Sequence, residues 1–533
     1  MRQLISIGRF AVCIVFTCWA ISFTGCGDGK SQPATNAQAK SDAAGSASMP
    51  LIAQDIAVAN EPESREGYDA IEENNFFDTI SQPQSTFSID VDTASYSNVR
   101  RLIRNGTRPP KGAIRLEELI NYFPYEYQEP TDESPFSVTT EIAQCPWKSD
   151  HQLMRVALRG RSLDLSDRKP CNLVFLIDVS GSMNSPDKLP LVQSALRMLV
   201  SELKPEDRIA IVVYAGGSGL VLDSTSASDA KTIVSAIDRL SAGGSTNGGA
   251  GIQLAYQVAQ TNRIDGGVNR VLLCTDGDFN VGVSSDSALV DLIQEEAKKN
   301  VFLSVLGFGH GNVRDSTMEK LADKGNGNYA FIDSMLEARK VLVDQIGGTL
   351  VTIAKDVKIQ LDFNPKHISA YRLLGYENRK LDNQDFRDDR KDAGEVGAGH
   401  TVTAFYELVP TGVTPPNNVG RESEFVERKS NAAADSPTML TVNLRYKQPD
   451  EEDSKEFQLR VDKTEVAATA SSDFRFAASV LAYGMLLRDS SYAGDASWDW
   501  VISTARDNLG KDSNGLRAEF LQLAMTASQL TKQ

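Results

Sequence analysis

The central third of the chain alternates short continuous apolar runs with segments whose apolar residues have helical spacing. The runs are CNLVFLID (171–178), DRIAIVVYA (207–215), VNRVLLCTD (268–276), VFLSVLGFG (301–309) and NYAFI (328–332). Amphipathic stretches such as LPLVQSALRMLVSEL separate them. Continuous apolar strands between amphipathic helices predict a mostly parallel sheet covered on both faces. We therefore expect a doubly wound, Rossmann-like α/β domain over residues 166–350.

The flanks of this central region show other patterns. Residues 351–465 contain strand-like runs such as DVKIQLDF and TVTAFYEL without helices between them, which predicts a β-sandwich-like domain. Residues 466–533 have apolar positions three and four apart and are expected to be helical. Residues 85–165 form an expected α+β segment. Because the ends of an α/β domain often lie close together, we expect strands at 136–160 and 351–462 to form one β-domain into which the α/β domain is inserted.

The N-terminal part of the chain fits none of these patterns. Residues 1–25 place two arginines before an apolar run too short for a membrane span, which predicts a signal peptide. The stretch FTGC at 23–26 resembles the lipobox of bacterial lipoproteins, in which the cysteine is lipidated, so Cys26 is the expected lipid-bearing residue. A plain signal peptide is the alternative. Residues 26–84, rich in Gly, Ser, Ala, Asn, Gln and Pro, are expected to form a flexible linker.

A lipidated Cys26 predicts a location in the cell envelope. More than one acyl chain would hold the protein stably on a membrane, whereas one chain alone would bind marginally. Gly27, and not Asp, follows the cysteine. By resemblance to sorting in Gram-negative bacteria, this favours the outer membrane, with the protein on the periplasmic face or at the cell surface.

The cysteines beyond Cys26 are odd in number. They are Cys145, Cys171 and Cys274. An odd number predicts at least one free thiol or an intermolecular bond. Cys274 lies inside an apolar run and is expected to be a buried free thiol. A bridge between Cys145 and Cys171 is possible in an exported protein, and the sequence leaves it open.

Length and charge narrow the class of function. The chain has 533 residues, of which 24% are charged, and a net charge of -16 at pH 7. This length is too great for one ordinary core and predicts several domains. Nucleic-acid binding needs a basic patch, so the acidic balance argues against a nucleic-acid partner.

Oxygen-bearing side chains stand at the ends of the strands expected in the α/β domain. Asp178 ends the first strand, and Ser180 and Ser182 follow at alternate positions, which directs all three toward one side. Thr246 lies in the Gly-rich stretch SAGGSTNGGAG, and Asp276 ends a later strand. Ligands of doubly wound sheets bind at the carboxyl ends of the strands. Without His or Cys among them, these residues predict a hard divalent cation: Mg²⁺ first, with Mn²⁺ or Ca²⁺ possible.

The five residues together resemble the metal-ion-dependent adhesion site of von Willebrand factor type A domains. The resemblance consists of Asp-x-Ser-x-Ser after a first strand, Thr in a Gly-rich loop, and Thr-Asp-Gly at a later strand end. It implies that Ser180 and Ser182 contact the metal directly and that Thr246 does so directly or through water. It implies that Asp178 and Asp276 act largely through water.

The flanks carry a second resemblance. FSIDVDTASYSNVRR before the α/β domain and GAGHTVTAFYEL after it are similar to segments of bacterial lipoproteins with a central type A domain. The resemblance to type A domains also implies that the last helix of the domain, MLEARKVLVDQIGG at 335–348, shifts when ligand binds. That shift would reach the β-domain that follows.

Other kinds of site fit less well. GGSTNGGAG lacks the Gly-Lys-Ser/Thr of a phosphate-binding loop. Asp90 and Asp92 suggest the Asp-x-Asp-x-Thr of aspartyl phosphotransferases, but Ala94 takes the place of Thr. The histidines are His151, His310, His367 and His400. None accompanies a Gly-x-Ser-x-Gly motif, and no nucleophile–base pair is visible, so we expect no enzymatic activity.

The metal site itself points to binding. Hydroxyl ligands are neutral, so the metal stays electrophilic, and a coordination position is left for a carboxylate from an Asp or Glu of a protein partner. The first hypothesis is a membrane-anchored, divalent-metal-dependent protein-binding module for adhesion or assembly. The alternative is a structural envelope lipoprotein in which the type A domain is not the binding site.

Overall fold

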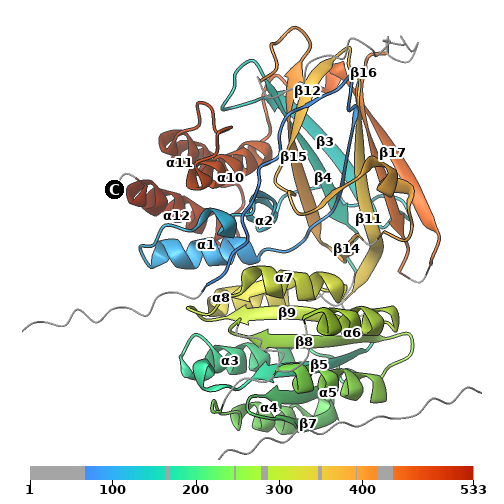
Figure 1. The fold of residues 1–533 in the computed structure, drawn as a ribbon, viewed down its shortest axis with the longest axis vertical. Helices are drawn as coiled ribbons and strands as arrows, with labels where there is room; N and C mark the ends of the chain where they lie inside the picture. The colour runs from blue at the N-terminus through green and yellow to red at the C-terminus, as the bar shows by residue number, and fades with distance from the viewer. Residues whose placement is uncertain are drawn as a thin grey trace, which may run out of the picture. The chain divides into compact units, whose positions relative to one another are not determined.

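The computed structural model describes residues 66–163, 168–244, 248–277, 286–345, 348, 351–391, 393–416, 436–449 and 451–531 (Figure 1). The expected signal peptide, Cys26 and the first part of the expected linker lie outside these residues, and so does Thr246.

An α/β domain occupies the middle of the described chain. Its sheet has the strand order β10-β9-β8-β5-β6-β7. The strands are β5 (Cys171–Asp178), β6 (Arg208–Tyr214), β7 (Ser218–Ser226), β8 (Val268–Thr275), β9 (Phe302–Phe308) and β10 (Tyr329–Ile332). All neighbours are parallel except β7, which runs antiparallel to β6. The predicted doubly wound, mostly parallel sheet is thereby confirmed.

Helices cover both faces of this sheet (Figure 1). They are α3 (Leu189–Val200), α4 (Ala230–Asp238), α5 (Gly248–Thr261), α6 (Asp286–Lys298), α7 (Asp315–Lys324) and α8 (Met335–Arg339). One apolar core joins the sheet to α3, α4 and α8, and another joins it to α5, α6 and α7. A Cβ atom at Gly251 would lie 2.8 Å from Cβ of Tyr214, so this glycine lets α5 approach β6 closely.

Strands from both sides of the α/β domain pair with one another. One sheet has the order β1-β12-β15-β4-β3, and a second has the order β13-β2-β11-β16-β17 with β14 paired to β11. The early strands are β1 (Phe77–Asp78), β2 (Gln84–Ser88), β3 (Phe136–Gln144) and β4 (Gln152–Gly160). The late strands are β11 (Thr352–Phe363), β12 (Ile368–Leu374), β13 (Lys380–Leu381), β14 (Gly394–Gly397), β15 (Thr401–Pro410), β16 (Thr438–Lys447) and β17 (Ser454–Asp462). An apolar core fills the space between the sheets. The α/β domain is therefore inserted into a β-sandwich, as the sequence predicts.

Helices from the two ends of the described chain form a further cluster. They are α1 (Ala94–Arg104), α2 (Leu116–Asn121), α10 (Ser472–Arg488), α11 (Trp498–Asp507) and α12 (Leu516–Leu530). One apolar core joins all of them. The expected α+β segment 85–165 is thus divided: its strands belong to the sandwich and its helices pack with the C-terminal helices. No described helix has the length and apolar character needed to cross a bilayer.

The expected linker 26–84 ends earlier than composition suggested. Residues 66–84 are described by the structure, and within them β1 pairs antiparallel with β12. Phe76 is buried, and the buried Thr79 hydroxyl donates to the Ile368 carbonyl at 2.6 Å. The linker prediction is therefore wrong for residues 66–84. Average composition hid two adjacent aromatic residues that can pack on a sheet edge.

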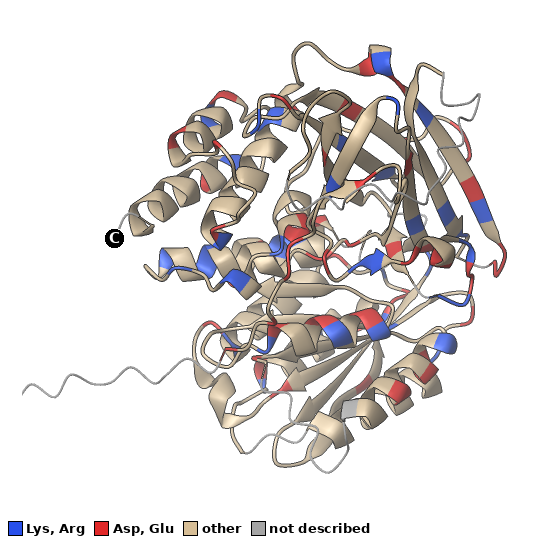
Figure 2. Cartoon of the chain, turned by 45° about the horizontal axis from the view of Figure 1, so that its top comes forward, with Lys and Arg blue, Asp and Glu red and all other residues tan. Residues whose placement is uncertain are grey.

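The described cysteines are all buried free thiols: Cys145, Cys171 and Cys274. The prediction for Cys274 is confirmed, and the bridge that the sequence left open between Cys145 and Cys171 is absent. Lys and Arg positions are scattered among Asp and Glu positions across the described fold in Figure 2.

Candidate metal centre

The end of strand β5 brings three of the predicted ligands together. Asp178 ends this buried strand and is fully buried itself, and Ser180 and Ser182 follow in the turn that continues into a 3-10 helix. The Ser180 backbone N–H donates to Asp178 Oδ1 at 2.8 Å, which fixes the carboxylate. The hydroxyl oxygens of Ser180 and Ser182 lie 3.0 Å apart. Ser180 is buried whereas Ser182 is exposed, so the cluster opens to solvent on one side.

Asp276 reaches the same edge of the sheet from the neighbouring strand. It follows directly after β8, which pairs in parallel with β5, and its side chain is fully buried. Burial, together with the negative charge of Asp276, raises the pKa of Asp178 to about 6. The two carboxylates therefore share an environment that a cation would make more favourable. Thr246, the fifth predicted ligand, is outside the described residues, so the structure gives it no position.

The arrangement of oxygens fits a small divalent cation. Octahedral Mg²⁺ binds oxygens at about 2.0–2.1 Å, which places adjacent ligand atoms about 2.8–3.0 Å apart. The separation of the Ser180 and Ser182 hydroxyls agrees with that spacing. The Asp178 carboxylate is buried and is hydrogen-bonded by Ser180 and Tyr214, but it forms no ion pair with a Lys or Arg of the described residues. Since a buried carboxylate without a cationic partner is costly, it favours a cation at this position.

Lys188 is a part of the site that sequence analysis missed. Its ammonium group donates to Asp276 Oδ2 at 2.8 Å, and the side chain is buried. A Cβ atom at Gly309, where φ is +79°, would lie 2.4 Å from Cε of Lys188. The lysine stem therefore passes over a glycine from another loop. No motif relates Lys188 to Asp276, which lies 88 positions later, so the sequence carried no signal for this ion pair.

His310 lies beside the same loop but pairs elsewhere. Its Nδ1 lies 2.7 Å from Asp187 Oδ2, and the ring is largely exposed. The pairing is that of a loop residue and provides no nucleophile–base set.

A second group of carboxylates lies between the α/β domain and the N-terminal helices. Oxygens of Asp90, Glu118 and Glu319 lie within 4.8 Å of one another, and all three residues are buried. Arg379 Nε donates to Asp90 Oδ2 at 3.2 Å, and Arg115 pairs with both Glu118 and Glu319. Guanidinium groups already supply the positive charge that a metal would bring. We therefore interpret this group as a buried ion-pair network.

Comparison with protein-family models covers most of the described chain. Residues 172–345 match the von Willebrand factor type A domain, and residues 62–155 match a model described as von Willebrand factor. Residues 348–530 match the C-terminal part of the uncharacterized protein YfbK. The central match coincides with the α/β domain, and the last match joins the late strands of the sandwich to the C-terminal helices.

Individual proteins extend these matches. The uncharacterized protein YfbK of Escherichia coli is 40% identical over 471 residues, which are 87% of this chain and 81% of YfbK. The uncharacterized protein sll0103 of Synechocystis is 29% identical over 186 residues, 35% of this chain and 43% of that protein. A solved von Willebrand factor type A structure from Catenulispora acidiphila covers 74% of this chain and 91% of its own, at 17% identity and a TM-score of 0.42. The chain belongs to the family of YfbK, with a von Willebrand factor type A domain inserted at its centre.

Proposed function

We propose that this protein is a divalent-cation-dependent protein-binding module that recognises a carboxylate of its partner. The proposal is supported chiefly by the exposed Ser182 hydroxyl beside the buried Ser180 and Asp178, because this places the oxygen ligands at an opening to solvent. Type A domains generally mediate protein interactions, which agrees with the family match.

The predicted ligands have distinct roles in this proposal. Ser180 and Ser182 would hold the cation through neutral hydroxyls, with Thr246 as a further ligand by resemblance. Asp178, fixed by the Ser180 N–H, would supply the negative charge. A bound divalent cation would supply a Lewis-acidic centre for an Asp or Glu side chain of the partner. Mg²⁺ is the preferred ion because every ligand is oxygen, with Mn²⁺ or Ca²⁺ as alternatives.

The test uses peptide partners that differ in one functional group. Peptides that carry a single Asp should bind the purified protein with Mg²⁺ and lose binding with EDTA, and matched peptides with Asn should not bind. Ser182→Ala and Thr246→Ala should each remove Asp-peptide binding while leaving the circular dichroism spectrum unchanged. Equal binding of Asp and Asn peptides, or binding that ignores EDTA, would refute a metal-bridged carboxylate.

A structural role in the cell envelope is the second candidate. It is favoured by the buried contacts that fasten the α/β domain to its surroundings, above all Arg100 of α1, which bonds to Asp333 and Glu337 of the α/β domain. Under this candidate, the sandwich and the helical cluster contact the partner. Thr246→Ala would then leave partner binding intact.

We also propose that Cys26 carries the lipid anchor and that the protein has no enzymatic activity. The support for the anchor is the FTGC stretch that ends at Cys26. Expression with a labelled fatty acid should label the natural chain and not Cys26→Ser, and the variant should leave the membrane fraction. Label on the variant would refute this assignment.

A further inference from the structure

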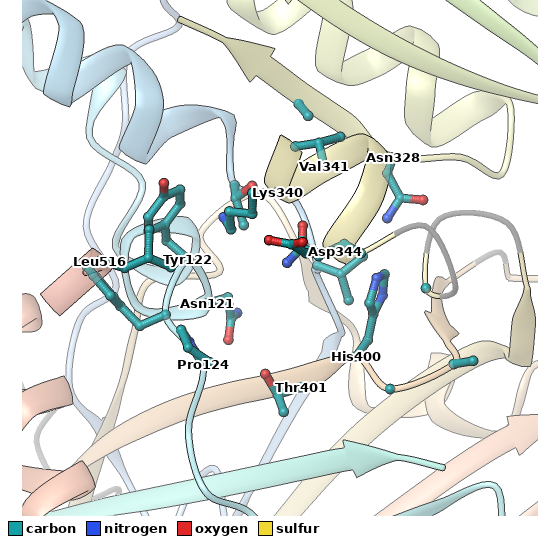
Figure 3. Close-up of a pocket in the computed structure, with 18 of the residues that line it drawn as sticks. Asn121, Tyr122, Pro124, Asn328, Lys340, Val341, Asp344, His400, Thr401 and Leu516 are labelled. Carbon is teal, nitrogen blue, oxygen red and sulfur yellow. The ribbon is translucent and has the colours of Figure 1, made fainter. Parts of the chain in front are cut away.

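A polar cavity lies where the α/β domain, the sandwich and the helical cluster meet, away from the predicted metal ligands. Its volume is about 410 Å³. Lys340 and Asp344 enter it from η5 (Lys340–Asp344), a turn of π-helix that continues α8. His400 enters it from the residue before β15, and Asn328 from the residue before β10 (Figure 3). Side chains from distant parts of the sequence therefore point into one space.

Lys340 brings a buried cation to this cavity, and its acidic partner Glu337 lies at the long end of ion-pair distance. The side chain is 8% exposed, and its Nζ forms no hydrogen bond within the described residues. Nζ lies 3.7 Å from Glu337 Oε1 and 3.3 Å from the centre of the Tyr122 ring. Glu337 already accepts bonds from Arg100 and Tyr122 through its other oxygen. An ammonium group buried in this way favours an additional anionic ligand.

The opposite wall adds further donors that lack partners. His400 Nδ1 and Arg159 Nε are buried and have no hydrogen-bond partner in the described part of the chain. Arg159 is held in place because its Nη1 donates to the Gly399 carbonyl at 2.7 Å and its Nη2 donates to Glu129 Oε1 at 3.1 Å, so only Nε is left for a ligand. The imidazole of His400 lies against Gly348, where a Cβ atom would be 2.0 Å from Nε2. The donors are thus fixed by their surroundings and are not free to reach other acceptors.

Charged groups of both signs surround the cavity: Lys340 and Arg159 are cationic and Asp344 is acidic. Burial, followed by the positive charges of Arg159, Arg270 and Lys340, lowers the pKa of His400 to about 4. His400 is therefore neutral near pH 7 and keeps one ring N–H to donate. The acidic lining residue Asp344 is part-exposed, and its Oδ1 lies 3.7 Å from Arg339 Nε, which offsets its charge.

We infer that this cavity binds a small oxyanion, a carboxylate or phosphate group, between Lys340 of the α/β domain and His400 and Arg159 of the sandwich. Phosphate and carboxylate oxygens accept charge-assisted hydrogen bonds from Lys340 and Arg159, and an ordinary hydrogen bond from the neutral imidazole of His400. The π-helical geometry of η5 agrees with a functional site, because such turns occur frequently at functional sites. The ligand would connect the last helical segment of the α/β domain to the β-sandwich. This site is independent of the proposed metal centre.

Calorimetric titration of the full-length protein tests this inference. Inorganic phosphate and acetate are titrated separately, in a low-chloride buffer freed of metals by a chelating resin. We expect at least one of the two anions to bind at one site per chain. Binding of phosphate alone would identify a phosphoryl ligand, and binding of acetate alone a carboxylate. No saturable binding of either anion up to about ten millimolar would overturn the inference.

Variants locate the binding. Lys340→Met and His400→Asn should each weaken the anion about ten-fold or more, since a charge-assisted or buried hydrogen bond is lost. Lys231→Met, at an exposed lysine of α4, should bind as the natural protein does. Asp178→Asn should also keep anion binding, which separates this site from the metal centre. If Lys340→Met does not fold, His400→Asn decides: unchanged affinity in that variant would refute the site.

Discussion

At the scale of single residues, the candidate metal centre depends on which positive charges compensate its two buried carboxylates, Asp178 and Asp276. Asp178 forms no ion pair with a described Lys or Arg, whereas the Lys188 ammonium group donates to Asp276 Oδ2. The uncompensated charge of Asp178 therefore favours a bound cation, and Lys188 gives Asp276 a positive charge from the protein itself. Lys188 thus lowers the cost of burying Asp276 when no metal is bound and competes with a metal for its negative charge.

Lys188→Met should separate these two effects. Removing one partner of a buried ion pair costs about 3–5 kcal/mol, so the metal-free variant should unfold at a lower urea concentration. Its affinity for Mg²⁺ should rise, because Asp276 no longer has a competing cation. Urea unfolding and calorimetric titration measure the two quantities. A variant that is destabilised but binds Mg²⁺ more weakly would show that Lys188 supports the metal site. Lys231→Met is the matched control at an exposed lysine.

Residues near one strand were predictable, and residues that meet only in the fold were not. Alternation along the chain was enough to place Asp178, Ser180 and Ser182 together, because a strand and its following turn are local structure. The end of a neighbouring parallel strand was enough for Asp276. The sequence did not predict the role of Lys188, because its contact with Asp276 depends on a turn and a glycine from separate loops.

At the scale of elements, helix α1 fastens the last helical segment of the α/β domain. Arg100 of α1 is 2% exposed, and its Nε donates to Asp333 Oδ2 at 2.8 Å. Its Nη2 donates to Glu337 Oε2 in α8 at 2.7 Å. The Tyr122 hydroxyl donates to the same Glu337 oxygen at 2.7 Å. These hydrogen bonds tie α8, which belongs to the segment expected to shift on ligand binding, to the helical cluster. A shift of α8 would therefore have to break or rearrange them.

Arg100→Gln should therefore lower the free energy of unfolding by about 3–5 kcal/mol, since it leaves buried carboxylates without their cation. Arg197→Gln is the matched control. Arg197 forms an ion pair with Asp238 in which both side chains are more than 40% exposed, so its loss should cost less than about 1 kcal/mol. Chemical unfolding of both variants measures the difference. Equal losses would mean that the Arg100 contacts do not hold α8.

Most elements of the fold followed from the periodicity of apolar residues, and the exceptions have physical causes. Strand β7 was not predicted. It lies at the edge of the sheet and much of it is exposed, so its sequence SGLVLDSTS lacks a long continuous apolar run. Strand β1 has two residues and is too short for any pattern. The π-helical turn η5 has no periodicity that distinguishes it from an α-helix.

At the scale of the whole molecule, buried acidic residues connect the α/β domain to the flanking parts. Glu117 and Glu118 belong to α2, and Glu319 belongs to α7. Burial raises the pKa of Glu117 to about 7, of Glu118 to about 8 and of Glu319 to about 7. Composition and net charge gave no indication of this network, because it forms only when separate parts of the chain pack together.

These shifts predict that stability falls as pH rises from about 4.5 to about 8 and levels off above the raised pKa values. The folded state holds protons on these carboxyl groups that the unfolded state releases near its ordinary pKa, so their contribution is full below about pH 4.5. It is lost as pH passes through the raised pKa values. Urea unfolding across this range should show the decline, and Glu118→Gln should reduce it. Glu126→Gln, at an exposed position, should leave the slope unchanged. A slope that Glu118→Gln does not alter would contradict the assignment.

The insertion of one domain into another was predictable because it needs only the order of strands and helices along the chain. Strands β3 and β4 pair with each other, but a single hairpin cannot bury its apolar face alone. Pairing of β4 with β15 and of β2 with β11 joins the early strands to the late ones. The helical cluster was harder to predict from the sequence, since α1 and α2 could equally have packed on the sandwich.

The central claim is that the end of strand β5 holds a divalent cation, and thermal unfolding with calorimetry tests it most directly. The purified protein is compared with Asp178→Asn, and with Asp238→Asn as an exposed control, in EDTA, Mg²⁺, Mn²⁺ and Ca²⁺. At a hundred times the dissociation constant, the cation should stabilise the protein by about 2.7 kcal/mol. We expect this gain with Mg²⁺ or Mn²⁺ in the natural protein and in Asp238→Asn, and its loss in Asp178→Asn. No stabilisation and no heat with any cation, or a gain that survives in Asp178→Asn, would contradict the account.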